Sequence, residues 1–371
     1  MNQEFLYKRL EERKQQNAYR QLRLPDGKID FCSNDYLGIV RNDLLSRPLT
    51  LDHRPSADFK HGSTGSRLLA GNYALLEETE KIISKFHDSE AGLIFNSGYD
   101  ANIGILGCVP QRGDTIIYDH LSHASIRDGI RLSFAQAFSF AHNDMENLEQ
   151  KLKAATGNIF VVTESVFSMD GDMAPLKEIT GLCEKYNASL IVDEAHATGV
   201  VGEKGEGLVQ DLNLQQKCFA RIHTYGKAVG CHGAIVLGSE NLRNYLINFS
   251  RTFIYTTALP ETSVEAIKKA YEIFPLMATE RNHLLQLVGY FQSSTINFER
   301  LTSTTPIQGI VVPGNELVKN LSVHLQSNNL DVRPILYPTV PKGSERLRIV
   351  LHAFNTMDEM QLLIENLHLK K

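Results

Sequence analysis

Short apolar segments alternate with longer amphipathic segments along most of this chain, from about residue 72 to residue 260. The apolar segments are rich in β-branched residues and end in polar or turn residues, as in 91–98, 158–165 and 189–196. The segments between them, such as 72–87, have the apolar spacing of a helix. This alternation predicts an α/β fold with a mostly parallel central sheet and helices on both faces. Ligands of such sheets bind at the carboxyl ends of the strands.

The pattern changes near the two ends of the chain. Residues 1–35 form a separate segment, with a polar helix expected over 3–22 and a short strand over 28–33. Residues 36–260 carry the strand–helix alternation and form the large domain. Residues 261–371 mix long helices with three further strands, which predicts a smaller α+β domain.

Charge and cysteine usage exclude several classes of protein. The 371 residues carry a formal net charge of −5 and contain no long block of lysine and arginine, which argues against nucleic-acid binding. The polar N-terminus predicts no secretory signal, and the lack of an apolar run of about 18 residues predicts no membrane span. Five scattered cysteines without CxxC spacing indicate reduced thiols of a cytoplasmic protein.

The segment IVDEAHATG, residues 191–199, contains the letters of a helicase DEAH box. Such a box needs a GxxxxGK[ST] loop, because its carboxylates hold the magnesium of a bound nucleoside triphosphate. The GK pairs at 27–28 and 226–227 do not stand in that pattern. The segment is therefore either a plain strand end that caps a helix, or a strand end that places an acid in a pocket.

Lys227 lies at the end of another predicted strand, close to two glycines and the hydroxyl of Thr224. A lysine held in a cleft can form a Schiff base, and a nearby carboxylate can keep the pyridinium nitrogen of pyridoxal 5'-phosphate (PLP) protonated. Asp193 would be that carboxylate, and His196 would bond the ring hydroxyl. The alternative is an exposed loop lysine with no part in catalysis.

The segment 96–99 joins a strand to a helix, so the backbone N–H groups of Gly98 and Tyr99 would face an anion at the helix N-terminus. A tight turn with a good N-cap is the alternative. The segment 119–125 has HxxH spacing, but no further Cys/His pair lies at ligand spacing, so we predict no metal site. We expect His123 to stack on the cofactor ring instead.

Nine segments resemble, in the same order, the α-oxoamine synthases, a family of fold-type-I PLP-dependent transferases. The resemblance covers nearly the whole chain, and the nine segments together are a specific signal. They are SNDYLG (33–38), GSTGSRLLAGN (62–72), FNSGYDAN (95–102), DHLSHASIRDGIRLS (119–133), VVTESVFSMDGDMAPL (161–176), VDEAHATGVVGEKGEG (192–207), TYGKAVGCHGA (224–234), RTFIYTTALP (251–260) and PTVPKGSERLRI (338–349).

The resemblance implies a role for each matching residue. Lys227 would bind PLP covalently and later remove the Cα proton of the amino acid, His123 would stack on the ring, and His196 would bond its phenolic oxygen. These are the three expected catalytic residues. The other implied cofactor contacts are Asp193, Ser168, Gly98, Tyr99, Thr224 and, from a second subunit, Thr256 or Thr257.

The resemblance also implies a homodimer with shared active sites, whose substrates are an amino acid and an acyl thioester. The expected reaction joins L-alanine to a pimeloyl group carried on CoA or acyl carrier protein, with loss of CO2. The implied substrate contacts are Arg20, Asn34, Thr339 and Arg348. The alternative within the family is a condensation of glycine with acetyl-CoA. A catalytically silent member of the fold would lack the lysine, which is present here.

Two positions depart from the family pattern. Ala197 replaces a glycine of the usual DEAHGTG. Leu336 and Tyr337 stand where synthases often have Arg and Pro, and Arg333 lies three residues earlier. An arginine that could contact the acyl partner is therefore missing at that point.

Overall fold

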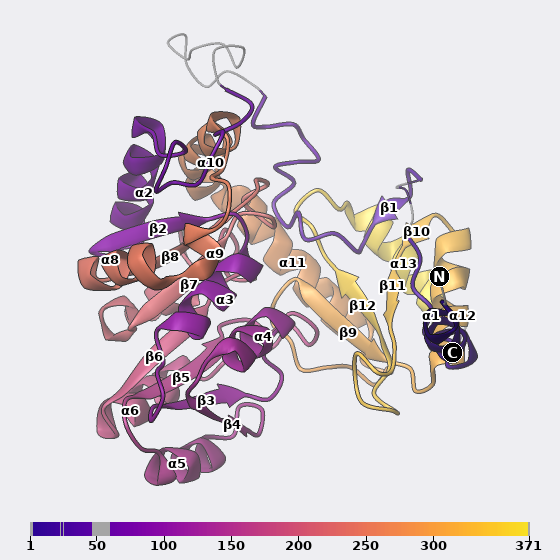
Figure 1. Cartoon of the computed structure of the whole chain (residues 1–371). Coiled ribbons are helices and arrows are strands. Elements are labelled where there is room, and N and C mark those ends of the chain that lie inside the picture. Colours follow the sequence, from indigo (N-terminus) through magenta and orange to yellow (C-terminus); the bar gives the residue numbers. More distant parts are fainter. Residues whose placement is uncertain (1–2, 23, 25, 47–59, 370–371) are drawn as a thin grey trace. The chain divides into compact units, whose positions relative to one another are not determined.

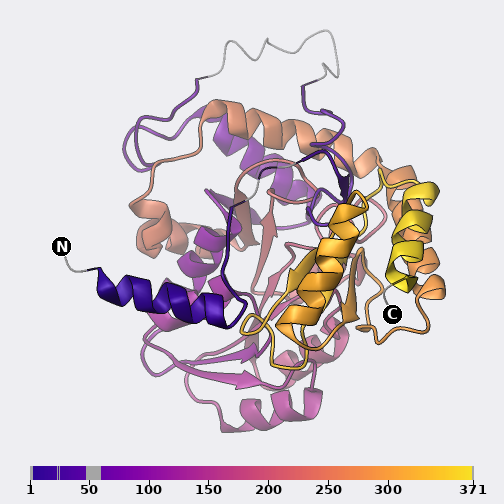
Figure 2. The same cartoon turned by 90° about the vertical axis from the view of Figure 1, so that its right-hand side faces the viewer.

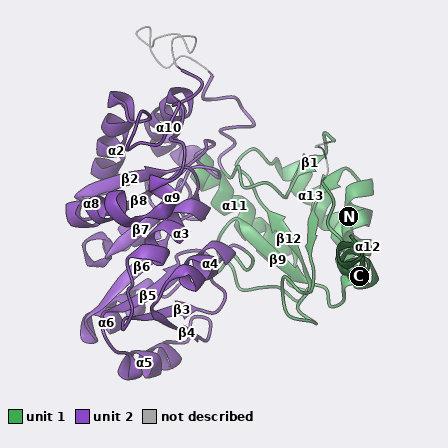
Figure 3. Cartoon of the chain, viewed as in Figure 1, with its two compact units in different colours: residues 1–36, 169–172, 280–371 green, residues 37–168, 173–279 purple. Residues whose placement is uncertain are grey.

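The computed structural model contains two compact units, which Figure 3 distinguishes by colour. We call residues 37–168 and 173–279 the large unit, and residues 1–36, 169–172 and 280–371 the small unit. The residues that the structure describes are 3–22, 24, 26–46 and 60–369.

The units differ in two ways from the expected domains. The N-terminal residues belong to the small unit, because β1 (Ile29–Asp30) pairs in parallel with β10 (Leu330–Asp331). The large unit extends beyond the expected boundary at residue 260, since α10 (Glu261–Ile273) packs against α2 (Ala74–Phe86).

A seven-stranded sheet forms the centre of the large unit (Figure 1), and this confirms the α/β prediction. Five neighbouring strands are parallel, and β8 runs antiparallel to both of its neighbours. In spatial order the strands are β2 (Ala91–Phe95), β8 (Ala234–Gly238), β7 (Ala220–Thr224), β6 (Ala188–Asp193), β5 (Ile159–Glu164), β3 (Thr115–Asp119) and β4 (Gln136–Phe140).

Helices follow most of these strands, as the alternation predicted. Buried residues such as Ile105, Ile126 and Leu246 pack with strand residues in one apolar cluster, which holds the strand ends in place. The helices of the large unit, besides α2 and α10, are α3 (Gly98–Cys108), α4 (Ala124–Leu132), α5 (Met145–Ala154), α6 (Leu176–Lys185), α7 (Leu208–Asp211), α8 (Glu240–Phe249) and α9 (Arg251–Ile254).

The small unit contains an antiparallel sheet in the order β11 (Arg333–Ile335), β12 (Arg346–Val350) and β9 (Ile307–Val311). Helix α12 (Asn315–Ser327) packs against β10, β11 and β12 (Figure 2). Most of α11 (Ala278–Ser294) and all of α13 (Met357–His368) belong to the same unit.

The N-terminal helix is shorter than expected. Helix α1 (Glu4–Gln15) buries no side chain, and Asn17 has a positive φ of 53°, which is incompatible with a continuing helix. The strand expected over 28–33 is reduced to the two residues of β1. No helix within the described residues is long and apolar enough to cross a bilayer, and all five cysteines are free thiols.

Two buried histidines lie in contact in the large unit: His223 belongs to β7, and His87 directly follows α2. The ring centroids of His87 and His223 are 3.9 Å apart. His87 Nε2 lies 3.0 Å from the Tyr271 hydroxyl, and His223 Nδ1 lies 2.9 Å from the Thr198 hydroxyl. Burial lowers the pKa of both rings well below 6.5, and the Arg221 guanidinium lowers both further.

Because of these two lowered pKa values, we expect the free energy of unfolding to fall as the pH is lowered. The unfolded chain takes up a proton on each histidine below about pH 6.5, whereas the folded state keeps both rings neutral. Stability therefore rises with pH through this range, by up to about 1.4 kcal/mol per pH unit for each ring. In urea titrations between pH 5 and pH 8, H223Q should lose about half of this dependence. The exposed control H368Q should keep all of it, and equal slopes for H223Q and the parent protein would contradict the assignment.

Candidate active site

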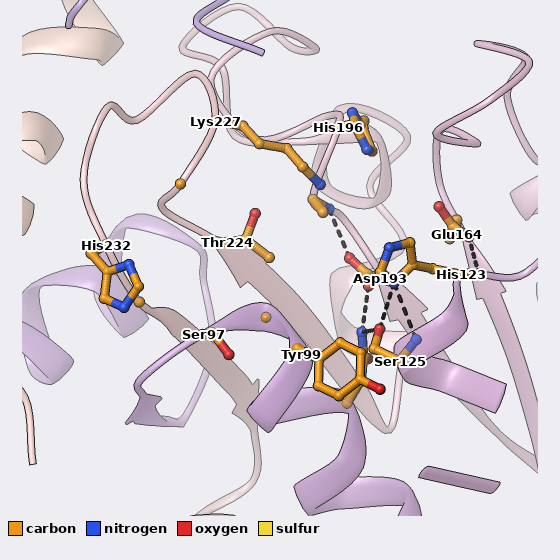
Figure 4. A pocket seen from close by; sticks show the side chains of 15 residues that line it. Ser97, Tyr99, His123, Ser125, Glu164, Asp193, His196, Thr224, Lys227 and His232 are labelled. Atoms are coloured by element: carbon orange, nitrogen blue, oxygen red, sulfur yellow. Dashed lines mark hydrogen bonds between the residues drawn. The ribbon is translucent and has the colours of Figure 1, made fainter. Parts of the chain in front are cut away.

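A cavity of about 240 Å³ lies at the carboxyl ends of the strands of the large unit. Asp193 ends β6, Thr224 ends β7, and Lys227 comes from the turn that follows β7. The N-termini of α3 and α4 border the same cavity through Gly98 and His123. Asp193 and Lys227 both line this cavity, and in Figure 4 the Lys227 side chain extends toward Asp193.

The two acids of the DEAH segment have separate environments. Asp193 lines the cavity, where the Asn102 side-chain amide donates to Oδ2 at 2.7 Å and the Ala195 N–H donates to Oδ1 at 2.9 Å. Glu194 is fully buried and accepts hydrogen bonds from the Ser165 hydroxyl, at 2.7 Å, and from two N–H groups at the start of α7. The second acid of the box is therefore occupied in holding a helix, and this excludes the nucleotide-motor interpretation.

His123 is the N-cap residue of α4 and is held at its backbone and at its ring. Its N–H donates to Glu164 Oε1 at 2.6 Å, and its ring Nδ1 lies 2.7 Å from the Ser125 hydroxyl. Burial lowers the pKa of the His123 ring. The negative charge of Asp193 raises this pKa, and the positive charge of Lys227 lowers it.

Glu164 is a buried carboxyl in the cavity lining that the sequence analysis did not select. Burial raises its pKa to about 8, and the neighbouring Asp193 adds to the rise. The signal that could have found it is strand register, because Glu164 of β5 is the parallel partner of Asp193 of β6.

Thr224 and the N-terminus of α3, which also line the cavity, fit the phosphate of PLP. The Thr224 hydroxyl is buried and has no hydrogen-bond partner among the described residues, so it is available to a ligand oxygen. A Cβ at Gly98 would collide with the Thr224 side chain, so this glycine keeps the start of α3 close to that hydroxyl. Backbone N–H groups at a helix N-terminus bind anions, and Ser97 caps α3 by accepting from the Asp100 N–H at 3.0 Å.

Seven of the predicted cofactor residues line the cavity, and three do not. Ser168 is absent from the lining. Thr256 and Thr257 are absent from it too; the side-chain amide of Asn96, the residue before Ser97 of the lining, donates to the Thr256 hydroxyl at 3.0 Å and to the Thr257 carbonyl at 2.8 Å. The predicted residues that the structure brings together are Gly98, Tyr99, His123, Asp193, His196, Thr224 and Lys227.

The four predicted substrate residues belong to the small unit, where they form two contacting pairs. Arg348 donates to Asn34 Oδ1 at 3.0 Å, and the buried Tyr36 hydroxyl donates to the same oxygen at 3.2 Å. Arg20 donates to the Thr339 hydroxyl at 3.3 Å. Each pair joins a residue of the N-terminal segment to a residue more than 300 positions later. Motif spacing along the sequence does not indicate such a contact.

Arg333 does not supply the arginine that is missing near Leu336. Its Nε lies 2.6 Å from Asp331 Oδ1, and its Nη2 donates to Oδ2 of the same carboxylate at 2.9 Å. This two-point ion pair neutralises the guanidinium within the small unit. Ala197, the other departure, is fully buried in the turn after β6.

Asp119, the residue before the HxxH motif, holds the chain after β3. Asp119 is fully buried and accepts hydrogen bonds from the N–H groups of Leu121 and Asn143, and His142 Nδ1 lies 3.0 Å from its Oδ2. Among the described residues no group of three or more His, Cys, Asp or Glu side chains could hold a metal ion.

Comparisons with known proteins agree with this architecture. A family model described as aminotransferase class I and II matches residues 26–367. The 8-amino-7-oxononanoate synthase of Emericella nidulans is 41% identical over 373 residues, which cover 93% of this chain and 89% of the relative. The solved 8-amino-7-oxononanoate synthase of Francisella tularensis is 31% identical, with a TM-score of 0.79, and the match covers 93% of this chain and 99% of that one. A high-resolution structure of SPT (serine palmitoyltransferase) with PLP is 25% identical, with a TM-score of 0.84, and the match covers 92% of this chain and 87% of that one.

Proposed function

The chain belongs to the aminotransferase class I and II family and is a PLP-dependent acyltransferase. We propose that it makes 8-amino-7-oxononanoate, an intermediate of biotin biosynthesis. The substrates are L-alanine and a pimeloyl thioester of CoA or acyl carrier protein, and the other products are CO2 and the free thiol. The observation that carries the proposal is the convergence of Lys227, Asp193 and His123 on one cavity beside an unpaired Thr224 hydroxyl.

Bound PLP supplies an electron sink that lowers the cost of forming a carbanion at the α-carbon of the amino acid. Lys227 would hold the cofactor through its Nζ and, whenever that amine is free, would accept the α-proton of alanine. The Asp193 carboxylate would favour protonation of the ring nitrogen. His196 would bond the phenolic oxygen, and His123 would shield the cofactor from water.

Arg348 binds the carboxylate of the amino acid through its planar guanidinium. Its contact with Asn34 supports this role, because Asn34 Oδ1 orients the guanidinium and is itself held by Tyr36. Arg20 and Thr339 are proposed as contacts to the thioester substrate. Ser168 is proposed as a further contact near the phenolic oxygen.

We further propose a homodimer with shared sites. Thr256 and Thr257 do not line the cavity of their own subunit, and we assign to them a contact with the phosphate held by a second subunit. The five free thiols support a cytoplasmic location.

The test is a substrate panel on the PLP-loaded protein. We expect CO2 release and an amino-ketone product, identified by mass spectrometry, only when L-alanine is combined with a pimeloyl thioester. Pimeloyl-CoA and pimeloyl-acyl carrier protein, assayed separately, identify the carrier. Product from glycine and acetyl-CoA instead would overturn the alanine assignment in favour of the alternative reaction.

The carboxylate site gives a matched pair of variants. R348K should raise the KM for alanine by about ten- to a hundred-fold, because lysine cannot reproduce a two-point contact. R333K should leave this KM unchanged, since Arg333 is occupied by Asp331. Equal effects of the two variants in steady-state kinetics would remove Arg348 from the alanine site.

A further inference from the structure

We propose that Asn102 is a positioning residue of the active site, and that its side-chain amide holds both the Asp193 carboxylate and, through Ser125, the ring of His123. Asn102 lies in α3 and lines the cavity. This inference deepens the proposed function, on which it rests, by assigning residues that orient two of the groups that face PLP.

The contacts form one continuous chain. Asn102 Nδ2 lies 2.7 Å from Asp193 Oδ2 and 3.0 Å from the Ser125 hydroxyl oxygen, and that oxygen lies 2.7 Å from His123 Nδ1. Figure 4 labels Asp193, Ser125 and His123. Asn102 is 2% exposed and Ser125 is 1% exposed, so water does not compete for these bonds.

Only one orientation of the Asn102 amide satisfies both neighbours. A carboxylate can accept hydrogen bonds but cannot donate them, so the atom 2.7 Å from Asp193 Oδ2 must be the amide nitrogen. That nitrogen carries two hydrogens, and its two contacts, Asp193 and Ser125, use both. An amide turned the other way would place its oxygen against the carboxylate and leave two buried acceptors facing each other.

The same reasoning assigns the hydrogens along the rest of the chain. The Ser125 backbone N–H donates to His123 Nδ1 at 3.2 Å, so Nδ1 is an acceptor and the neutral ring carries its hydrogen on Nε2. The Ser125 hydroxyl therefore donates to Nδ1, while its oxygen accepts from Asn102.

The arrangement fixes the Asp193 carboxylate at both oxygens. Ala195 donates to Oδ1 and Asn102 donates to Oδ2, so the group cannot rotate, and each oxygen keeps a lone pair for a ligand in the cavity. Buried donors that hold a charged group in one orientation preorganise the site for a ligand.

Three variants separate the two branches of this chain of contacts, which are the bond from Asn102 to Asp193 and the bonds from Asn102 through Ser125 to His123. N102L has nearly the same volume and removes both donors, whereas S125A removes only the branch to His123. The control T79V removes a buried hydroxyl that bonds to the Leu75 carbonyl within α2 and has no contact with the cavity.

The first measurement is the dissociation constant of PLP, followed by absorbance. We expect N102L to bind PLP about ten- to a hundred-fold more weakly, because a charged hydrogen bond in a buried site is lost. S125A should weaken binding less than N102L does, because it keeps the donor to Asp193, and T79V should stay within about threefold of the parent protein. Should N102L fail to fold, N102D keeps the shape of the side chain, and we expect at least about tenfold weaker binding because an acid replaces the donor to Asp193.

The second measurement is the NMR titration of the His123 ring in protein without PLP. S125A should raise the pKa of His123, because the hydroxyl hydrogen no longer occupies Nδ1. N102L should change this pKa less when it is added to S125A than in the parent protein, because the route through the Ser125 hydroxyl is then absent and only the route through Asp193 remains.

An N102L protein that folds and binds PLP as well as T79V would overturn the proposal. Weakening of PLP binding by S125A equal to that by N102L would also overturn it, because the branches would not be separate. Both measurements are made without amino acid or thioester. A parent protein that binds PLP but forms no product would therefore contradict the proposed reaction while the role of Asn102 remains measurable.

Discussion

Replacement of Lys227 by alanine should prevent covalent attachment of PLP and lower kcat by about a thousand-fold or more. The lysine both holds the cofactor and moves the α-proton, and general-base catalysis alone accounts for about 10²- to 10⁴-fold. No other lysine lines the cavity among the described residues, so no neighbour can take its place.

The measurement is reduction with borohydride followed by mass spectrometry of peptides. PLP should be fixed to the peptide that contains Lys227 in the parent protein and to no peptide of K227A. The control K204A, an exposed lysine in the same unit, should keep both the attachment and the activity. Attachment of PLP to another lysine in the parent protein would remove Lys227 from the site.

Replacement of Asp193 by asparagine should lower kcat/KM by about 10²- to 10³-fold with a loss of stability of about 1 kcal/mol. The variant keeps the shape of the side chain, but its single amide oxygen can accept only one of the two hydrogen bonds that Asn102 and Ala195 now donate, and it loses the charge that would stabilise the protonated ring nitrogen. Steady-state kinetics and thermal unfolding of the same preparation separate the two effects.

The neighbouring acid provides the control, because it should show the opposite pattern. E194Q should lose about 3 kcal/mol of stability, since a buried amide nitrogen would face N–H groups of α7 that now donate to the carboxylate. The folded fraction of E194Q should keep near-normal kinetics. Similar kinetic losses in D193N and E194Q would contradict the separation of the two acids.

Much of the large unit followed from the sequence alone. The alternation of strands and helices is a local property, because apolar period and turn residues are set by neighbouring side chains. Lys227, Asp193 and His196 could be selected because strand ends in a parallel sheet meet at one edge. The helices over 240–249 and 251–254 were not predicted, although Ser239 and Ser250 precede them as N-cap residues.

The residues that support the site could not be selected from the sequence. Asn102 and Ser125 lie inside ordinary helical segments, and only the packing of α3 beside α4 brings the Asn102 amide to both Asp193 and Ser125. Glu164 became part of the cavity through the register of β5 against β6.

The sequence determined the order of the elements and the identity of the reactive groups, because both depend on residue type and local spacing. The tertiary structure alone decided which partners those groups have. Arg333 could have replaced a missing substrate contact, but folding placed it on Asp331. Arg348 donates a hydrogen bond to Asn34, which lies 314 residues earlier in the chain. Such pairings depend on long-range packing, which a linear pattern of residues does not record.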